Sequence, residues 1–196
     1  VYALLHREPH LKQYAEKIFF IAGRLVFTSD YSRVAGRMFH SMLVASPRDM
    51  AENEPIKREL ARLNIRSFKE GKERQRHGHL LVLYPEGTRS RDGKMGQFHG
   101  ALYNYLEGTV VLPIAITGAD KILHSHSFTF ELTDGSMTLG EPIFVGPADA
   151  APRDIINLDA DSLARETRKQ EAMDTIGRKV AAMLPEDMRG AYASAP

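Results

Sequence analysis

The chain has 196 residues, of which 43% are hydrophobic and 26% charged, values that are typical of globular proteins and exclude a disordered one. The absence of cysteine excludes disulfides, thiol nucleophiles and Cys-ligated metal centres. The net charge of +1 combines +7 over residues 1–100 (18 basic, 11 acidic) with −6 over residues 101–196 (8 basic, 14 acidic). The basic half favours an anionic partner, although a solvated helix face explains it equally well.

The first half of the chain contains two predicted strands. Residues 18–27 are apolar but are broken by Gly23 and Arg24. They are too short to cross a membrane, so a buried strand is favoured over an interfacial patch. Residues 41–46 form the second strand, which ends at the turn signal Pro47-Arg48-Asp49.

A basic helix is predicted over residues 55–75. Its apolar stripe consists of Ile56, Leu60 and Leu63, and Pro55 suits a first helical position. The other faces carry much of the basic excess of the first half: Lys57, Arg58, Arg62, Arg66, Lys69 and Lys72.

The continuous apolar run 80–84 predicts a central strand buried on both faces. A short helix is expected over residues 100–107 and a second strand over 110–116, in which Pro113 favours an edge, a strand start or a bulge. This order of elements favours a right-handed crossover with a parallel strand pair.

The remaining elements are a hairpin and a terminal helix. Residues 128–132 and 137–139 alternate around an Asp-Gly turn, which predicts a hairpin. Residues 149–152 are interpreted as a linker inside the domain, and residues 161–183 as an amphipathic helix. The sequence therefore predicts one α/β domain over residues 1–196, with a mixed, largely parallel sheet flanked by helices.

A polar loop follows the buried run, at the end of a strand where open α/β sheets bind their ligands. Its arginines offer forked donors for a phosphate, and its glycine lets a ligand come close to the backbone. Its Thr and Ser hydroxyls can donate hydrogen bonds, and its carboxylate can accept one from a substrate hydroxyl. The alternative is a surface turn with an ion pair between its carboxylate and an arginine. The candidate substrate-binding residues are Glu86, Gly87, Thr88, Arg89, Ser90 and Arg91.

This loop resembles a block of the glycerolipid acyltransferases. Leu83-Tyr84-Pro85-Glu86-Gly87-Thr88-Arg89-Ser90 is similar to their FPEGTRS block, which makes a glycerol-phosphate acyltransferase-like fold the expectation. Downstream, Phe98-His99-Gly100-Ala101 looks like their F-K-x-G-A stretch, with one residue fewer and His for Lys. Residues 111–116 and 140–143 resemble their V-P-V and G-x-P-I blocks.

Two upstream stretches look more like the soluble, plastid-type glycerol-3-phosphate acyltransferases. Residues 15–23 resemble their A-E-x-x-I-F-V-A-G strand, and residues 64–70 their N-T-R-S-L-K-E helix. Arg48 lies near the position of a phosphate-binding basic residue, although Pro47 and Asp49 replace neighbours that are usually basic.

The resemblance implies transfer of a fatty acyl group from acyl-CoA or acyl-ACP, as co-substrate, to a hydroxyl of glycerol 3-phosphate or lysophosphatidic acid. No other cofactor and no metal is expected, and nucleic acid is not expected as a partner. The expected partners are the acceptor, the acyl thioester and a membrane surface. The expected location is the cytoplasmic side of a membrane, held peripherally or through a missing N-terminal segment.

The catalytic base implied by the resemblance is not found in these 196 residues. In the family it is a histidine in an H-x-x-x-x-D block, and none of the eight histidines here has Asp five positions on. The nearest pair, His126 and Glu131, follows the loop instead of preceding it. We therefore expect a truncated N-terminus and an inactive fragment, with loss of the base in a pseudoenzyme as the rival explanation.

Three other functions stay open. The pairs His77/His79 and His124/His126 are two residues apart, as the ligands of a metallohydrolase site on a strand would be, although hydrogen-bonded or solvated histidines are favoured. Nucleic-acid binding would use the basic stretch 57–79, which has few aromatic residues. A non-catalytic module that binds lipid phosphate is the strongest alternative, because the loop is present and the base is not.

Overall fold

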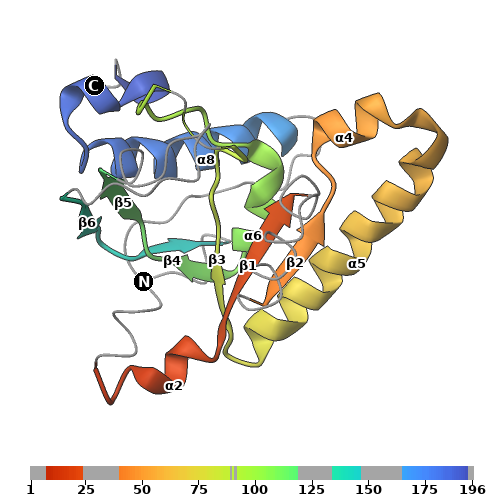
Figure 1. Ribbon diagram of the computed structural model, residues 1–196, viewed down its shortest axis with the longest axis horizontal. Helices are drawn as coiled ribbons and strands as arrows, with labels where there is room; N and C mark the ends of the chain where they lie inside the picture. The colour runs from red at the N-terminus through yellow and green to blue at the C-terminus, as the bar shows by residue number, and fades with distance from the viewer. Residues whose placement is uncertain are drawn as a thin grey trace. The chain divides into compact units, whose positions relative to one another are not determined.

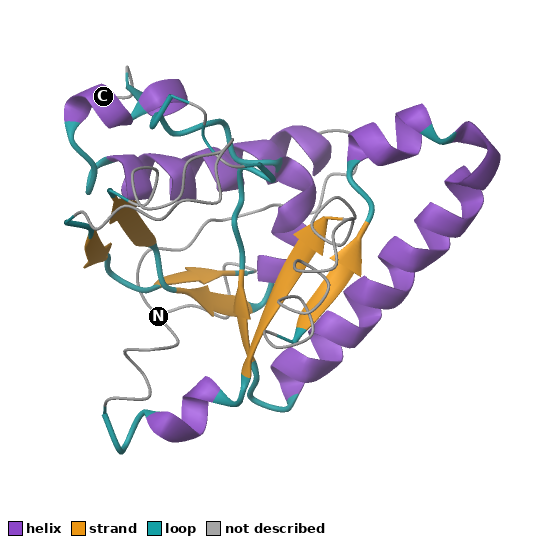
Figure 2. Ribbon diagram, viewed as in Figure 1, coloured by secondary structure: helices purple, strands orange, loops and turns teal. Residues whose placement is uncertain are grey.

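The computed structural model describes residues 8–23, 40–88, 90, 92–118, 134–146 and 165–193. The chain separates into two compact units, Val1–Tyr84 and Pro85–Pro196 (Figures 1 and 2). The expectation of one domain over the whole chain stays a prediction. The predictions for residues 24–27, 128–132 and 149–152 fall outside the described residues.

The first unit is built around a parallel sheet. Its strands are β1 (Ile18–Gly23), β2 (Ser41–Val44) and β3 (Leu80–Val82), in the order β2-β1-β3. Phe20 is paired with Ser41 on one side of β1 and with Val82 on the other. Ile18 and Phe19 are buried, so the prediction of a core strand is confirmed for the described part of residues 18–27.

Helix α5 (Lys57–Arg76) packs on β2, and a short 3-10 helix (Glu54–Ile56) precedes it (Figure 1). The predicted helix over 55–75 is therefore confirmed. Its buried positions are Leu60, Ser67 and Gly71, only one of which is a large apolar residue. Small and polar residues on this face bring the helix backbone close to the strand. A further short helix, α2 (Lys12–Ala15), precedes β1.

The predicted turn at residues 47–49 is instead the start of helix α4 (Pro47–Glu52). Ser46 is its N-cap: the Ser46 hydroxyl accepts from the Asp49 N–H (3.1 Å), and the Asp49 carboxylate accepts from the Ser46 N–H (2.9 Å). This reciprocal pairing, with Pro47 in the first turn, is a capping box, which uses the same residue types as a turn.

The prediction of a central, doubly buried strand over residues 80–84 is wrong for the described sheet. β3 is shorter, lies beside β1 at the sheet edge, and leaves Leu80 46% exposed. The central strand is β1. An apolar run predicts a strand, but strand order follows from which neighbours pair on each side, which the run does not encode.

The second unit contains two antiparallel strand pairs. β4 (Thr109–Val111) pairs with β7 (Ile143–Val145), and β5 (Ile114–Thr117) pairs with β6 (Ser136–Leu139). Pro113 separates β4 from β5, in agreement with the interruption expected at a residue without an N–H. Residues 137–139 form the predicted strand, and its described partner is β5.

Helices of the second unit lie close to the predicted positions. A 3-10 turn (Gly100–Leu102) continues into α6 (Tyr103–Leu106), and α8 (Arg165–Ala181) packs against both. Two further 3-10 turns follow at Glu186–Met188 and Gly190–Tyr192. Met173 and Ile176 are the buried anchors of α8.

The expected parallel crossover from residues 80–84 to 110–116 is also wrong for the described strands. β3 pairs with β1, whereas β4 pairs antiparallel with β7. The physical reason is that the helical part of the connection is short (residues 100–106), and the described residues before it form a loop that is bonded to Gln170 of α8 at Phe98 and Gly100. The coarser expectation of an α/β fold with a parallel sheet flanked by helices is confirmed.

Among the described residues, no helix combines the length and the apolar composition that a membrane span requires.

Candidate phosphate-binding loop

The loop that follows Tyr84 is held by one of its own carboxylates. The Glu86 side chain accepts a hydrogen bond from the Gly96 N–H through Oε2 (2.6 Å). Burial is the main cause that raises the pKa of Glu86. The bond from Gly96 opposes this effect, and the nearby charge of Asp92 adds to it. Glu86 therefore closes the loop between residues 86 and 96 from inside, a role that its motif does not reveal.

Gly87 stands where the chain turns sharply. Its φ of +67° lies in the left-handed region that favours glycine. A Cβ at this position would lie 3.0 Å from Cδ2 and 3.1 Å from Nε2 of His99. His99 is itself tied to the loop, because its N–H donates to the Pro85 carbonyl (3.0 Å). The exposed imidazole of His99 therefore borders Gly87, at the position where the resemblance places a lysine.

The tip of the loop is organised by Asp92. Its Oδ1 accepts from the Lys94 N–H (3.1 Å) and from the Ser90 hydroxyl (3.2 Å). The bond from Lys94 is the main cause that lowers the pKa of Asp92, so this carboxylate is charged at neutral pH. Gly93 provides the positive φ (74°) that the turn needs.

The end of the loop is bonded to α8 through its backbone. Gln170 Nε2 donates to the Phe98 carbonyl (2.8 Å), and its Oε1 accepts from the Gly100 N–H (3.0 Å). Gln170 Nε2 also donates to Asp174 (3.0 Å). One side chain thus satisfies two backbone groups of the loop, which sets the path of residues 98–100.

Tyr192 completes this attachment. Its hydroxyl accepts from the Phe98 N–H (2.9 Å) and donates to Asp174 (2.9 Å). The ring packs edge-on against Phe98, with centroids 5.7 Å apart. Burial is the main cause that raises the pKa of Tyr192 to about 12, so the hydroxyl keeps its proton at physiological pH.

A second backbone clamp lies beside it. The Met95 N–H donates to the Met188 carbonyl, and the Met95 carbonyl accepts from the Ala191 N–H, both at 2.9 Å. Gly190 lies against this carbonyl with a φ of +49°, and a Cβ there would overlap it. Residues 186–192 therefore hold the loop at Met95, which follows the turn at Gly87 in the sequence.

Four of the predicted site residues are described in one loop, Glu86, Gly87, Thr88 and Ser90, and Thr88 is exposed. Arg89 and Arg91 lie outside the described residues, so their phosphate-binding role stays a prediction. Arg48 belongs to the first unit, where its backbone lies in the first turn of α4.

Within the first unit, the parallel sheet relates Arg48 to the start of the loop. β2 and β3 flank β1 and run in the same direction, two strand spacings or roughly 10 Å apart across the sheet. Val82, the last residue of β3, is level with Phe20 and Ser41, whereas β2 continues three residues further to Val44.

No motif in the sequence points to Gln170, Asp174 or Tyr192. Gln170 and Tyr192 lie 70 to 94 residues beyond their partners in the loop, and Asp174 accepts from both of them. Gln170 and Tyr192 carry no local signal, because their loop partners are backbone groups far away in the chain.

The described histidine pair is accounted for by α5. Nδ1 of His77 lies 2.9 Å from the Glu73 carbonyl, and Nδ1 of His79 lies 3.2 Å from the Arg74 carbonyl. Both rings thus bond carbonyls in the last turn of α5, which also accept backbone N–H groups of His77 and His79. Within the described ranges no group of three or more His, Asp or Glu side chains is placed to hold a metal ion. The pair His124/His126 lies outside them.

Comparison with known protein families identifies one that matches this chain. The Acyltransferase family model matches residues 9–117, which contain β1 to β5 and the loop. This match covers more than half of the chain, and the chain belongs to the acyltransferase family.

Two plant proteins are among its relatives. A chloroplastic 1-acyl-sn-glycerol-3-phosphate acyltransferase of Brassica napus is 30% identical over 112 residues, 56% of this chain and 33% of the relative. A chloroplastic protein of the same name from Arabidopsis thaliana is 33% identical over 75 residues, 37% of this chain and 21% of the relative. The chain thus matches a third or less of the length of these curated relatives.

A solved structure was also found to be similar. The 1-acyl-sn-glycerophosphate acyltransferase PlsC of Thermotoga maritima aligns over 82% of this chain and 56% of its own, with 19% identity and a TM-score of 0.46.

Proposed function

We propose that this chain carries the acceptor-binding part of an O-acyltransferase of glycerolipid synthesis. In the reaction, the oxygen of an acceptor hydroxyl attacks the carbonyl carbon of an acyl thioester. The carbon–oxygen bond forms, the carbon–sulfur bond breaks, and the proton of the hydroxyl passes through a base to the leaving thiol. The acceptor would be lysophosphatidic acid, which fits the names of the two plant relatives, or glycerol 3-phosphate.

The loop from Pro85 to Gly100 is the observation that carries this proposal. It belongs to the matched family segment, and its described residues are bonded to the rest of the second unit at Glu86, Phe98 and Gly100. Backbone positions that are already fixed lose little entropy when a ligand binds beside them.

Within this proposal, Arg89 and Arg91 bind the acceptor phosphate, whereas a phosphate-binding role of Arg48, in the first turn of α4, stays a prediction. Guanidinium groups suit this role because their forked donors match two phosphate oxygens. Removing one such partner costs about 1.5–3 kcal/mol, or roughly 10- to 150-fold in affinity.

We expect Arg89→Ala to weaken binding of sn-glycerol 3-phosphate to the 196-residue chain at least tenfold by isothermal titration calorimetry. Arg76→Ala is the control, because this arginine lies exposed on α5 and pairs with Glu73 (3.3 Å). Equal affinity of Arg89→Ala and the unaltered chain would remove Arg89 from the phosphate site. Failure of the unaltered chain to bind the acceptor would overturn the proposal.

The catalytic base is the point that separates an enzyme from a non-catalytic module. None of the eight histidines of this chain stands in an H-x-x-x-x-D block, which is the observation that favours the module as second candidate. The product of the complete reading frame should be assayed with acyl-CoA and acyl-ACP donors and each acceptor. Ester formation would support the enzyme, whereas acceptor binding without turnover would support the module.

The proposal also places the protein at the cytoplasmic face of a membrane, because the acceptor lysophosphatidic acid and the acylated product are lipids. Both thioester donors are water-soluble, so the reaction would take place where the aqueous donor meets the lipid acceptor.

A further inference from the structure

Helix α5 has an exposed face opposite its attachment to the sheet. At about 100° per residue, its buried positions Leu60, Ser67 and Gly71 share one side of the helix. Asn64 lies on the same side, where its side chain bonds both backbone groups of Ala45 (2.8 and 3.0 Å). These contacts determine which face of α5 remains open.

The open face carries a cationic stripe, which consists of Arg58, Arg62, Ile65, Arg66 and Lys69. The stripe spans about 100° around the helix and about 16 Å along it. All five residues are exposed. The helix as a whole has eight basic and three acidic residues, a net charge of +5.

The cations of the stripe differ from the other basic residues of α5. Lys57, Arg74 and Arg76 pair with Glu54, Glu70 and Glu73 at 3.0, 2.6 and 3.3 Å. Among the described residues, none of the four stripe cations has an ion pair. Glu59 and Glu70 border the stripe, and Glu70 is engaged by Arg74. The stripe therefore keeps its charge available to a partner.

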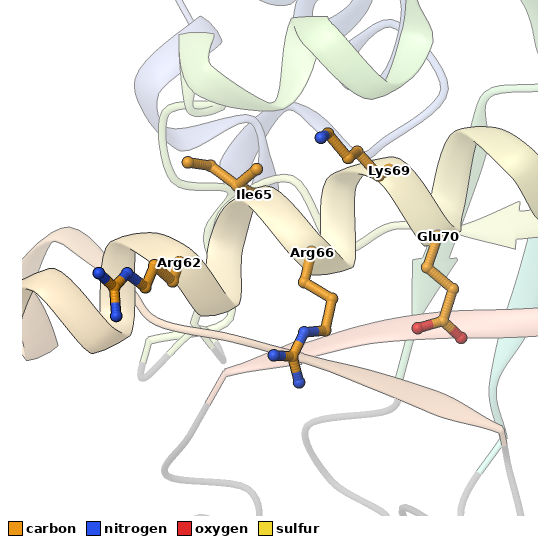
Figure 3. A pocket seen from close by; sticks show the side chains of 5 residues that line it. All are labelled: Arg62, Ile65, Arg66, Lys69 and Glu70. Carbon is orange, nitrogen blue, oxygen red and sulfur yellow. The ribbon is translucent and has the colours of Figure 1, made fainter.

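A hollow of about 450 Å³ lies on this face, lined by Arg62, Ile65, Arg66, Lys69 and Glu70 (Figure 3). Ile65 is 56% exposed, which is unusual for an isoleucine in the middle of a long helix. An aliphatic side chain between three cations offers contact to both the charged and the apolar part of a lipid surface.

We propose that this stripe docks the protein on an anionic membrane surface, with lipid phosphates over the hollow. Charge complementarity is the argument, since clusters of Lys and Arg on a helix are attracted to acidic headgroups. The inference rests on the proposed function in one respect: an enzyme that acylates a lipid acceptor must hold its loop at a lipid surface. A nucleic acid fits less well, because the stripe carries no aromatic residue for stacking.

The test measures co-sedimentation of the 196-residue chain with vesicles at low ionic strength. We expect binding to phosphatidylcholine vesicles that contain phosphatidylglycerol, and little binding to phosphatidylcholine alone. The triple variant Arg62→Gln, Arg66→Gln, Lys69→Gln should lose roughly 100-fold in partition coefficient, about fivefold for each cation. Added salt should reduce binding of the unaltered chain in the same direction.

The matched control is the triple variant Lys12→Gln, Lys17→Gln, Lys57→Gln, which loses the same charge at exposed positions outside the stripe. Lys57 lies on α5 in an ion pair with Glu54. This control should bind like the unaltered chain, and circular dichroism should show both variants folded. Equal losses in the two variants, or equal binding to neutral and acidic vesicles, would overturn the proposal.

Two further outcomes are informative. Stripe-dependent binding to a double-stranded oligonucleotide without binding to acidic vesicles would identify a nucleic-acid surface and also overturn it. The assay contains no acceptor and no donor, so its failure leaves the Arg89 titration standing. Conversely, failure of the Arg89 titration leaves a positive vesicle result standing.

Discussion

At the scale of single residues, Glu86 shows how a loop side chain serves structure and site together. Its carboxylate closes the loop on the Gly96 N–H, yet burial raises its pKa. The folded state therefore binds a proton on Glu86 more readily than the unfolded chain does. By linkage, its contribution favours folding at low pH and is lost as the pH rises from the ordinary value of 4.5 through the raised pKa.

We expect Glu86→Gln to remove this part of the pH dependence. As the pH rises through that window, the free energy of unfolding of the unaltered chain should fall relative to that of the variant. Urea denaturation at a series of pH values measures it. Glu141→Gln, at an exposed carboxylate of the second unit, is the control. A difference that is constant with pH would show that Glu86 does not titrate with folding.

At the scale of elements, α5 is attached to β2 by polar side chains as much as by apolar ones. Asn64 bonds the N–H and the carbonyl of Ala45, and the Ser67 hydroxyl donates to the Leu43 carbonyl (2.6 Å). These bonds satisfy backbone groups where the chain leaves the strand for α4. Because hydrogen bonds need a defined geometry, they specify the position of α5 relative to β2 more strictly than an apolar contact does.

Asn64→Leu should therefore destabilise the first unit despite its similar volume. The change leaves two part-buried backbone groups of Ala45 without partners, at about 1–3 kcal/mol each. Hydrogen exchange should accelerate at Ala45 and along β2. The control Glu59→Ala, on the exposed first turn of the same helix, should leave exchange unchanged. Slow exchange at Ala45 in Asn64→Leu would show that these bonds contribute little.

At the scale of the whole molecule, the candidate loop depends on the far end of the chain. The loop is bonded to Gln170 and Tyr192, and its Met95 to the turn that contains Gly190. Gly177 on α8 makes room for this arrangement, because a Cβ there would overlap the Tyr192 ring. In the second unit, the loop, α8 and residues 186–192 therefore pack together. The first unit is built around a sheet of its own.

Gly177→Ala should displace Tyr192 and loosen the loop. Overpacking costs typically 1–3 kcal/mol, against about 1 kcal/mol gained from helix propensity. Amide exchange over residues 95–100 should rise about tenfold while that of β1 and β2 stays unchanged. Gly23→Ala, where a Cβ meets nothing within 4 Å, is the control. Equal acceleration in both units would show that they unfold together.

The local elements could be predicted from the sequence. The helix around residues 57–76, the strand at Ile18 and the break at Pro113 follow from periodicity and from missing backbone donors, which neighbours in the chain decide. The prediction of a turn at residues 47–49 is wrong because capping boxes and turns use the same residue types. For the site, the motif identifies Glu86 and Gly87 as candidate residues. It does not predict that the Glu86 carboxylate accepts a hydrogen bond from the Gly96 N–H.

Local patterns in the sequence predict the family motif around Glu86 and Gly87, the positions of the main helices and strands, and the concentration of positive charge on residues 57–76. The central position of β1, the antiparallel pairing of β4 with β7, and the bonds of Gln170 and Tyr192 to the loop emerge from the folded chain alone. The reason is physical. Periodicity, capping and backbone restrictions act between residues close in the chain, whereas strand order and long-range hydrogen bonds depend on which distant surfaces bury each other.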